Sequence, residues 1–477
     1  MNRQTNQRTS QFAYPHTSPS TNLSPKPARR LPKRLVATAL CAACWLPVQL
    51  GAQPIPGTPG TPATPAPVRQ GGGGFGFSFD LGSVLKAVQA VQAVQAAVAD
   101  ERYSSPDPSN LNRYEPRQVI LSWADAQQNQ AAAAVQSAGG FLLANAALTN
   151  LGLNIVVLSF DTDAQAASAL IRLQSTPGIT ADRHAIAYPM QQAAAAAAPP
   201  IPARHYAHEL LKAPPKGSGK LGASITVGII DTEVTNADAL AVGNFKSKRM
   251  FADTDKPAPA DHGNAVASIV AASGQGFEGL AQGVALRAAG VMREVAPGIN
   301  ATNTLLVAQA LDWMVGEKVQ VVNLSLGSAS DAVLSTVITK SLGTGMVLVA
   351  AAGNGGPTAA PSYPAAYPGV IAVTAVDAKK RLYARANRGD YVAIAAPGVD
   401  VWVPLAANDS KGRYMSGTSF ASPFVAAAVA QVVAQGAASQ PKTATPASAQ
   451  VILQTLCSKA ADIGPKGPEV GCGLLQM

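Results

Sequence analysis

The sequence predicts an α/β fold built on a mainly parallel sheet, and three observations lead to it. Hydrophobic residues make up 47% of the 477 positions while aromatic residues make up only 5%, a balance typical of tightly packed α/β layers. Residues 225–231 form a β-branched apolar run that ends in an acid, as a buried parallel strand would. Small-residue helical segments follow His262 and Ser419.

Ser419 lies between a small-residue turn and an Ala/Val-rich helical run that extends to about Val433. A helix N-terminus has unpaired N–H groups and a partial positive charge, so a hydroxyl here stands beside donors suited to an oxyanion. Taken alone, the same serine is an ordinary helix cap. The interpretation therefore depends on partners elsewhere in the chain.

Asp231 and His262 are candidate partners. Asp231 ends its strand at the carboxyl edge of the expected sheet, where open α/β sheets place their sites. His262 opens a helix between this strand and the Ser419 helix. Singly, such an Asp is more often a helix cap and such a His more often a surface or core residue. Together with Ser419 they match the acid, base and nucleophile of acyl transfer.

Asn354 supplies a fourth group. It follows the strand-like run 346–352 in a Gly-rich loop, where asparagine is also a common turn residue. Its amide could instead donate to a tetrahedral oxyanion, with the Ser419 N–H as the second donor.

At this point the chain resembles the subtilisin-like serine proteases, the subtilase or peptidase S8 family. The Asp, His, Ser order is the subtilisin order and differs from the chymotrypsin-like and α/β-hydrolase orders. The matching stretches run from about Tyr206 to the C-terminus in the family's order and are Val227–Val234, His262–Ala267, Val321–Gly327, Val349–Gly355, Ala393–Val399 and Ser416–Pro423.

This resemblance implies a three-layer α/β/α domain and a serine endopeptidase mechanism. Ser419 would attack the scissile carbonyl, His262 would move the proton, and Asp231 would orient the imidazole and stabilise its charged form. Asn354 and the Ser419 N–H would receive the oxyanion. Ser325, Leu326 and Gly327 would form the edge strand on which an extended polypeptide substrate pairs.

Two residues depart from the family pattern. Glu233 stands where the family usually has Gly, and Asn264 where it usually has Thr. Glu233 would raise the pKa of His262 if it faced inward, but we expect it to face solvent. The alternative function is a catalytically inactive secreted binding module that keeps the subtilase shell. A dedicated processing protease with one partner is a third possibility.

The formal charge of +9 indicates no nucleic-acid partner. Residues 1–34 contain seven cations and no acidic residue, so the remainder carries about 9 − 7 = +2. Those cations lead into an apolar run of signal-peptide length, and we expect residues 1–52 to be an export leader rather than a stable membrane span. A late start codon, a twin-arginine signal at Arg29-Arg30 and a lipoprotein signal at Cys41 or Cys44 are alternatives. The predicted location is periplasmic or extracellular.

Cys457 and Cys472 are the two cysteines beyond the leader. In an exported protein they most simply form one disulfide, and the alternative is two reduced buried thiols. No acidic loop shows clear calcium-ligand spacing, so we predict no cofactor or metal, and we expect a monomer.

The remaining regions define the domain plan. Residues 53–116 are expected to be a Pro/Gly-rich linker with one amphipathic helix at 81–98. Residues 117–190 have a β-α-β-β-α-β pattern, a ferredoxin-like order, and resemble the inhibitor-I9-like propeptide of the family, a folding helper and temporary intramolecular inhibitor. A small unrelated α/β domain is the alternative. Residues 191–205 are expected to be a processing linker and 206–477 the catalytic domain, with the cut between Tyr188 and Lys216.

Overall fold

The computed structural model describes residues 113–190, 204–213, 220–274, 277–404, 412–439, 448–464 and 467–477. The expected leader, the linker with its 81–98 helix up to residue 112, and residues 191–203 of the processing linker lie outside these ranges.

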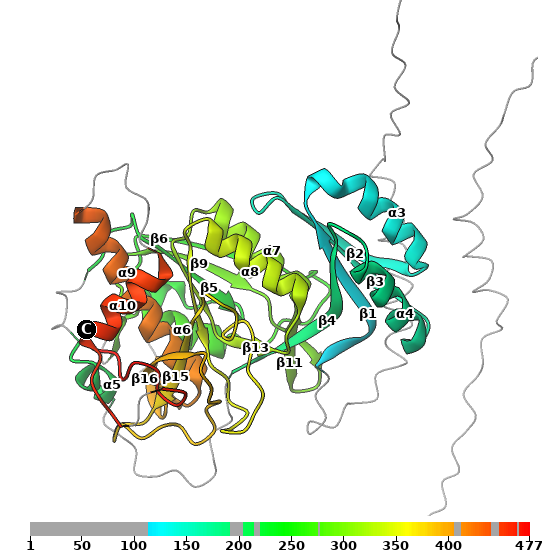
Figure 1. Ribbon diagram of the computed structural model, residues 1–477. Coiled ribbons are helices and arrows are strands. Elements are labelled where there is room, and N and C mark those ends of the chain that lie inside the picture. The colour runs from blue at the N-terminus through cyan, green and yellow to red at the C-terminus, as the bar shows by residue number, and fades with distance from the viewer. Residues whose placement is uncertain are drawn as a thin grey trace, which may run out of the picture. The chain divides into compact units, whose positions relative to one another are not determined.

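The N-terminal part of the described chain has the β-α-β-β-α-β order (Figure 1). Its antiparallel strands are arranged β2-β3-β1-β4. The elements are β1 (Tyr114–Trp123), η2 (Asp125–Gln127), α3 (Gln128–Ala138), β2 (Phe141–Leu148), β3 (Leu153–Ser159), α4 (Asp163–Gln174) and β4 (Thr180–Pro189). Strand β2 includes an Ala-rich second half, because this half pairs with β3 over Ala146↔Ile155 and neighbouring positions.

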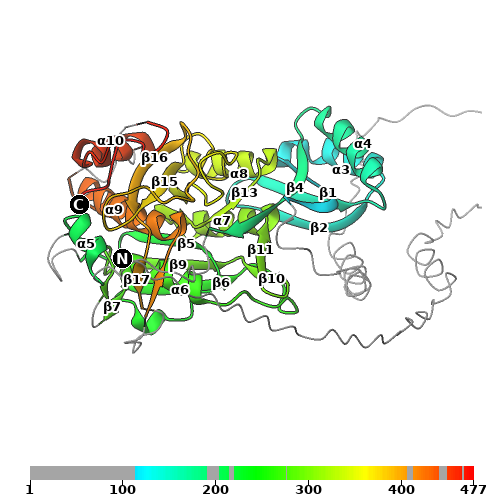
Figure 2. The ribbon, with the colours of Figure 1, turned by 90° about the horizontal axis from the view of Figure 1, so that it is seen from below.

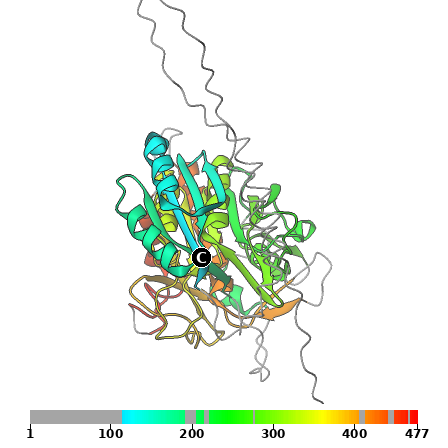
Figure 3. The same cartoon turned by 90° about the vertical axis from the view of Figure 1, so that its right-hand side faces the viewer.

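The two faces of this small sheet bury different partners. Val119 and Leu121 of β1 pack with α3 and α4, whereas Ile120 between them shares a core with helices of the larger domain. This alternation follows from the two-residue period of a strand. The second face therefore packs on α7 (Thr304–Gly316) and α8 (Ala332–Gly343), which lie between the two sheets in Figure 1. Figure 3 shows the N-terminal domain, in cyan, in front of the larger domain.

The larger domain is a three-layer α/β/α sandwich, which confirms the predicted fold class. Its seven strands are ordered β16-β15-β14-β12-β5-β9-β6, and every pairing between neighbours is parallel. They are β5 (Thr226–Asp231), β6 (Asn244–Arg249), β9 (Ala285–Gly290), β12 (Val321–Leu324), β14 (Val347–Ala351), β15 (Ile371–Val376) and β16 (Val392–Pro397).

Each face of the parallel sheet has its own hydrophobic core. Ile229 packs on the side of α6 (Asp261–Ala271) and α9 (Thr418–Ser439), and the next residue, Ile230, packs on the side of α7 and α8. Helices α5 (Tyr206–Leu210) and α10 (Ala449–Lys459) complete the α9 layer (Figure 2). Among the described residues, only α9 is long and apolar enough to span a membrane, and 67% of that segment is buried in this core.

Short elements connect the layers. They are η3 (Ala237–Ala239), β7 (Ser273–Gly274), β8 (Phe277–Glu278), β10 (Arg293–Ala296), β11 (Ile299–Asn303), β13 (Leu326–Ser328), β17 (Val401–Val403) and β18 (Arg413–Met415). Strands β11 and β13 both pair with β4, so the last strand of the N-terminal domain continues into the larger domain.

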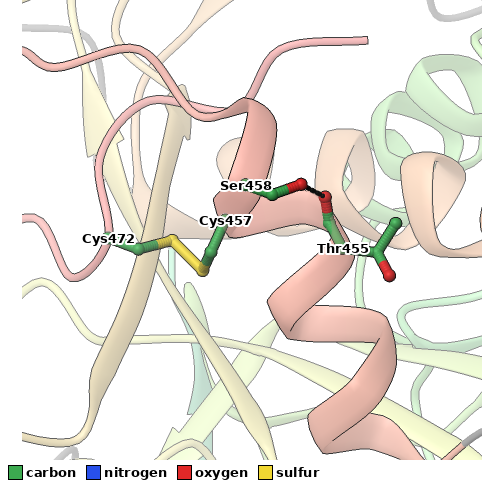
Figure 4. Close-up of a disulfide and its surroundings, with 4 residues drawn as sticks. All are labelled: Thr455, Cys457, Ser458 and Cys472. Carbon is green, nitrogen blue, oxygen red and sulfur yellow. Dashed lines mark hydrogen bonds between the residues drawn. A yellow bond between two sulfur atoms is a disulfide. The ribbon is translucent and has the colours of Figure 1, made fainter.

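The C-terminal segment is held at the edge of the parallel sheet. A disulfide joins Cys457 of α10 to Cys472, with the two Cα atoms 5.5 Å apart (Figure 4). Beyond it, Ala395 of β16 donates to Gly473 O and accepts from Leu475 N, both at 2.9 Å. The covalent link therefore fixes a segment that extends the sheet by main-chain hydrogen bonds.

Candidate active site

Asp231 and His262 meet at the carboxyl edge of the parallel sheet. Asp231 is the last residue of β5, and His262 is the second residue of α6. Asp231 Oδ1 lies 2.6 Å from His262 Nδ1, and both side chains are 2% exposed. Within the described chain, His262 Nε2 is buried and has no hydrogen-bond partner. This arrangement leaves one imidazole nitrogen available to accept a proton while the carboxylate holds the other.

The two departures from the family pattern occupy different surroundings. Glu233 forms a bidentate ion pair with Arg249, at 2.9 and 3.0 Å. Its carboxylate is partly exposed and is balanced by the guanidinium. Asn264 is buried, and its Oδ1 accepts the N–H of Thr235 at 2.8 Å.

Ser419 is the second residue of α9 and is fully buried. Its Oγ donates to the main-chain oxygen of Met190, at 2.5 Å, rather than to the imidazole. The Ser325 hydroxyl donates to Ser419 O at 3.0 Å and ties the start of α9 to the segment before β13.

The Asn354 amide points at the same Met190 oxygen. Its Nδ2 donates to Met190 O at 2.6 Å. Its Oδ1 accepts from the Thr418 N–H at 3.0 Å and from the Thr418 hydroxyl at 2.9 Å, which fixes the amide with its NH₂ toward the cleft. Gly417 allows this approach, because a β-carbon there would lie 2.5 Å from Met190 O. The Met190 carbonyl thus lies within hydrogen-bond distance of both the predicted oxyanion donor, Asn354 Nδ2, and the predicted nucleophile, Ser419 Oγ.

The chain's own β4 lies in an extended cleft between two strands. Leu326 and Gly327 of β13 pair antiparallel with Pro189 and Tyr188, and Met190 N donates to Ser325 O at 3.2 Å. On the other side β11 pairs with the same strand (Figure 2). The three residues expected to bind substrate therefore contact an extended segment through their main chain.

The methionine side chain packs over Gly327. A β-carbon at Gly327 would collide with the Met190 methyl group and with the Ser362 hydroxyl. This part of the cleft has a volume of about 450 Å³ and is also lined by Asn354 and Arg385.

Sequence reasoning missed several of these residues. Met190, Gly417, Thr418 and strand β11 carried no separate signal, although Met190 falls inside the expected cutting range. The available hint was that Met190 follows the last predicted strand and precedes an Ala-rich run. Only the pairing register identifies it as the residue opposite the two donors.

A second contact zone joins the N-terminal domain to α7. Asp312 accepts the main-chain N–H groups of Asn150 and Leu151 at 2.9 and 3.0 Å and the Asn150 amide at 3.0 Å. The carboxylate thereby satisfies the turn between β2 and β3 with charge-assisted hydrogen bonds.

Nearby, His184 of β4 is buried against the first turn of α7. Its Nε2 accepts from Leu305 N at 3.3 Å, so its Nδ1–H donates to Gln118 Oε1 at 2.9 Å. Burial, reinforced by the positive charge of Arg293, lowers the pKa of His184 to about 3. The imidazole is neutral in this interface.

Asp331 caps α8 beside the same strand. It accepts from the N–H groups of Val333 and Leu334 at 2.8 and 3.0 Å and from Ala185 N at 3.4 Å. Burial raises the pKa of this carboxyl to about 6 despite these donors. In the ranges that the structure describes, no three His, Cys, Asp or Glu side chains cluster as metal ligands would.

The fold and this site define a serine-protease class of protein, and comparison gives the family. Residues 222–474 match the subtilase family, Peptidase S8. The chain therefore belongs to the subtilase family of serine proteases.

Individual relatives agree. The minor extracellular protease Epr of Bacillus subtilis strain 168 is 30% identical over 268 residues, which are 54% of this chain and 39% of Epr. Subtilisin DY of Bacillus licheniformis is 34% identical over 230 residues, 46% of this chain and 80% of that protein. The crystal structure of fervidolysin from Fervidobacterium pennivorans, a keratinolytic enzyme related to subtilisin, aligns with a TM-score of 0.57 over 77% of this chain and 61% of its own. Its 21% identity makes it a likeness of fold.

Proposed function

We propose that this protein is an exported serine endopeptidase that is made as an autoinhibited precursor. One observation carries the proposal: Met190 O accepts from both Asn354 Nδ2 and Ser419 Oγ while Met190 N donates to Ser325 O. The residue is held as the acyl residue of a peptide bond would be held for attack. The N-terminal domain is accordingly the propeptide, and the bond between Met190 and Gln191 is the first one cut.

The reaction follows from the groups around that carbonyl. Ser419 Oγ attacks the carbonyl carbon while its proton passes to His262 Nε2, and the Asp231 carboxylate stabilises the imidazolium. The developing oxyanion is bound by Asn354 Nδ2 and the Ser419 N–H. The intermediate collapses to an acyl-enzyme as His262 protonates the leaving amine. Water, deprotonated by the same imidazole, then releases the carboxylate and restores Ser419.

Other polypeptides would use the same cleft once β4 has left it. The main-chain bonds to β13 and β11 recognise any extended segment, and the pocket over Gly327 holds the side chain before the cut. Export is supported by the expected leader and by the Cys457–Cys472 disulfide, since such bonds persist in oxidising compartments.

The test is the intact mass of the chain expressed from Gln53 onward. The active protein should split into a fragment ending at Met190 and one beginning at Gln191, and should gain peptidase activity. The Ser419→Ala variant should stay whole, whereas Ser341→Ala, which removes a buried serine of α8 far from the cleft, should still be cut. If the unmodified chain stays whole and shows no peptidase activity after an external protease removes the propeptide, the inactive binding module is the better description.

A further inference from the structure

The Asp231–His262 pair depends on how two separate elements are held together. Asp231 ends β5, whereas His262 belongs to α6, thirty-one positions later in the chain. Between β5 and η3 the chain passes along the first turns of α6 as the loop of residues 232–236. Whatever fixes this loop to α6 also fixes the distance between carboxylate and imidazole.

Asn264 makes the central contacts between the loop and the helix. Its Oδ1 accepts from Thr235 N at 2.8 Å and from Asn236 N at 3.3 Å, and its Nδ2 donates to Thr235 Oγ1 at 3.1 Å. The side chain is 6% exposed. An amide has an acceptor and a donor in one plane, so it can satisfy two adjacent backbone N–H groups and a hydroxyl at once.

Further hydrogen bonds join the same loop to α6 on both sides of Asn264. Toward the catalytic pair, Thr232 Oγ1 accepts from Gly263 N at 2.8 Å. Away from it, Asn236 Nδ2 donates to Ser268 Oγ at 3.1 Å. Asn264 therefore lies in the middle of a row of side-chain bonds that begins one residue after each member of the pair.

We propose that Asn264 is a positioning residue for the Asp231–His262 pair, acting through the loop of residues 232–236. This inference rests on the proposed function. The hydrogen bonds of Asn264 to Thr235 and Asn236 hold the loop that follows Asp231, so its effect reaches the reaction through the placement of the carboxylate and the imidazole. Without the amide, the Thr235 N–H and the buried Asn236 N–H lose their acceptor, and the loop shifts to recover hydrogen bonds.

A shift of the loop should alter two properties of the enzyme. Misplacement of a catalytic group by about 1 Å costs roughly 100-fold in rate, so kcat should fall while KM changes little. A looser bond to Asp231 also stabilises the charged form of the imidazole less, which should show in the pH profile of the reaction. The other charges near the start of α6 are neutralised in pairs, Glu233 with Arg249 and Asp261 with Arg413.

The test compares Asn264→Ala with a control that removes a similar amide. Gln282 is also 6% exposed, and its Nε2 donates to Ala272 O at 2.7 Å, at the opposite end of α6 from His262. Kinetics of the processed enzymes on one peptide substrate are measured from pH 5 to 9. We expect Asn264→Ala to lose roughly 10- to 100-fold in kcat, with KM within about twofold and the acid limb of kcat/KM moved to lower pH. Gln282→Ala should have the kcat of the unmodified enzyme, and the acid limb of its kcat/KM profile should not move.

Asn264→Asp guards against simple misfolding, because its carboxylate keeps an acceptor for the Thr235 and Asn236 N–H groups. It should recover most of the kcat lost in Asn264→Ala. Equal losses in the Asn264→Ala and Gln282→Ala variants, or an unmoved acid limb, would overturn the positioning role. Absence of activity in the unmodified processed enzyme would instead overturn the proposed function itself.

Discussion

If the N-terminal domain is the proposed propeptide, replacing His184 by glutamine should remove a pH-dependent weakening of its complex with the larger domain. Neutral His184 accepts the Leu305 N–H at the positive end of α7 and donates to Gln118. If the ring were protonated, its Nε2–H would face the Leu305 N–H, and the ring would add a positive charge near Arg293. The bound complex therefore excludes the imidazolium, and acid should favour release.

The magnitude follows from the two pKa values. A pKa of 6.5 in the free domain and about 3 in the complex means that association is unaffected above pH 6.5 and weakens as the pH falls below it. Between pH 7.5 and 5.0 the histidine alone lowers affinity by roughly 30-fold, about 2 kcal/mol.

Two buried acids have the opposite effect on the pH dependence of affinity, because they favour association at lower pH. Asp331, with its pKa raised from 3.8 to about 6, takes up a proton more readily in the complex and strengthens it by up to roughly 10-fold over the same interval. Burial also raises the pKa of Glu115 beside Arg293. Because both acids are present in either protein, the ratio between the His184→Gln variant and the unmodified enzyme isolates the histidine.

The assay is dilution of the processed complex at each pH. The protein concentration at which half of the limiting peptidase activity appears measures the dissociation constant. Normalising to the limiting activity at each pH removes the pH dependence of catalysis itself. The unmodified complex should lose roughly 30-fold more affinity than His184→Gln between pH 7.5 and 5.0. A His205→Gln variant, at an exposed histidine outside this interface, serves as the control. Equal pH dependence in the unmodified and His184→Gln proteins would refute the reasoning.

Two further changes test the site and the fold. Asn354→Ala should lower kcat by roughly 100- to 1,000-fold with little change in KM, which is the loss known for the corresponding amide of a subtilisin. Steady-state kinetics of the processed enzyme test this, and a rise in KM without a fall in kcat would contradict it. Changing Cys457 and Cys472 to serine should reduce the free energy of unfolding by about 3 kcal/mol, because the disulfide closes a loop spanning 15 positions. The measurement is denaturant unfolding in a Ser419→Ala background, which prevents self-digestion. An unchanged denaturant midpoint would contradict this prediction.

Local sequence predicted much of the architecture because its signals are local. The apolar run at 225–231, the small-residue helix after His262 and the helix after Ser419 each specify an element and its end. The position of Asp231 at the carboxyl edge of the sheet followed from its strand, whereas its contact with His262 was implied by the resemblance to the subtilases. In the N-terminal domain the strand and helix periods gave the correct order of elements.

Pairing between distant segments decided the rest. Strand β2 extends to Leu148 because β3 supplies hydrogen bonds that its Ala-rich sequence does not predict. Glu233 faces Arg249, which lies on β6, and no local pattern links the two residues. Such contacts depend on the register of neighbouring strands, which a single sequence does not display.

The sequence alone predicted the fold class and four candidate site residues, because each of these residues lies beside the end of an element that its own residues specify. The tertiary structure alone decided that Met190 lies opposite Asn354 and Ser419, because that depends on how β4 aligns with β13. It also decided that Asn264 joins the loop after Asp231 to the helix of His262. Side-chain hydrogen bonds reach only a few ångströms, so they are fixed once the packed layers have brought distant residues together.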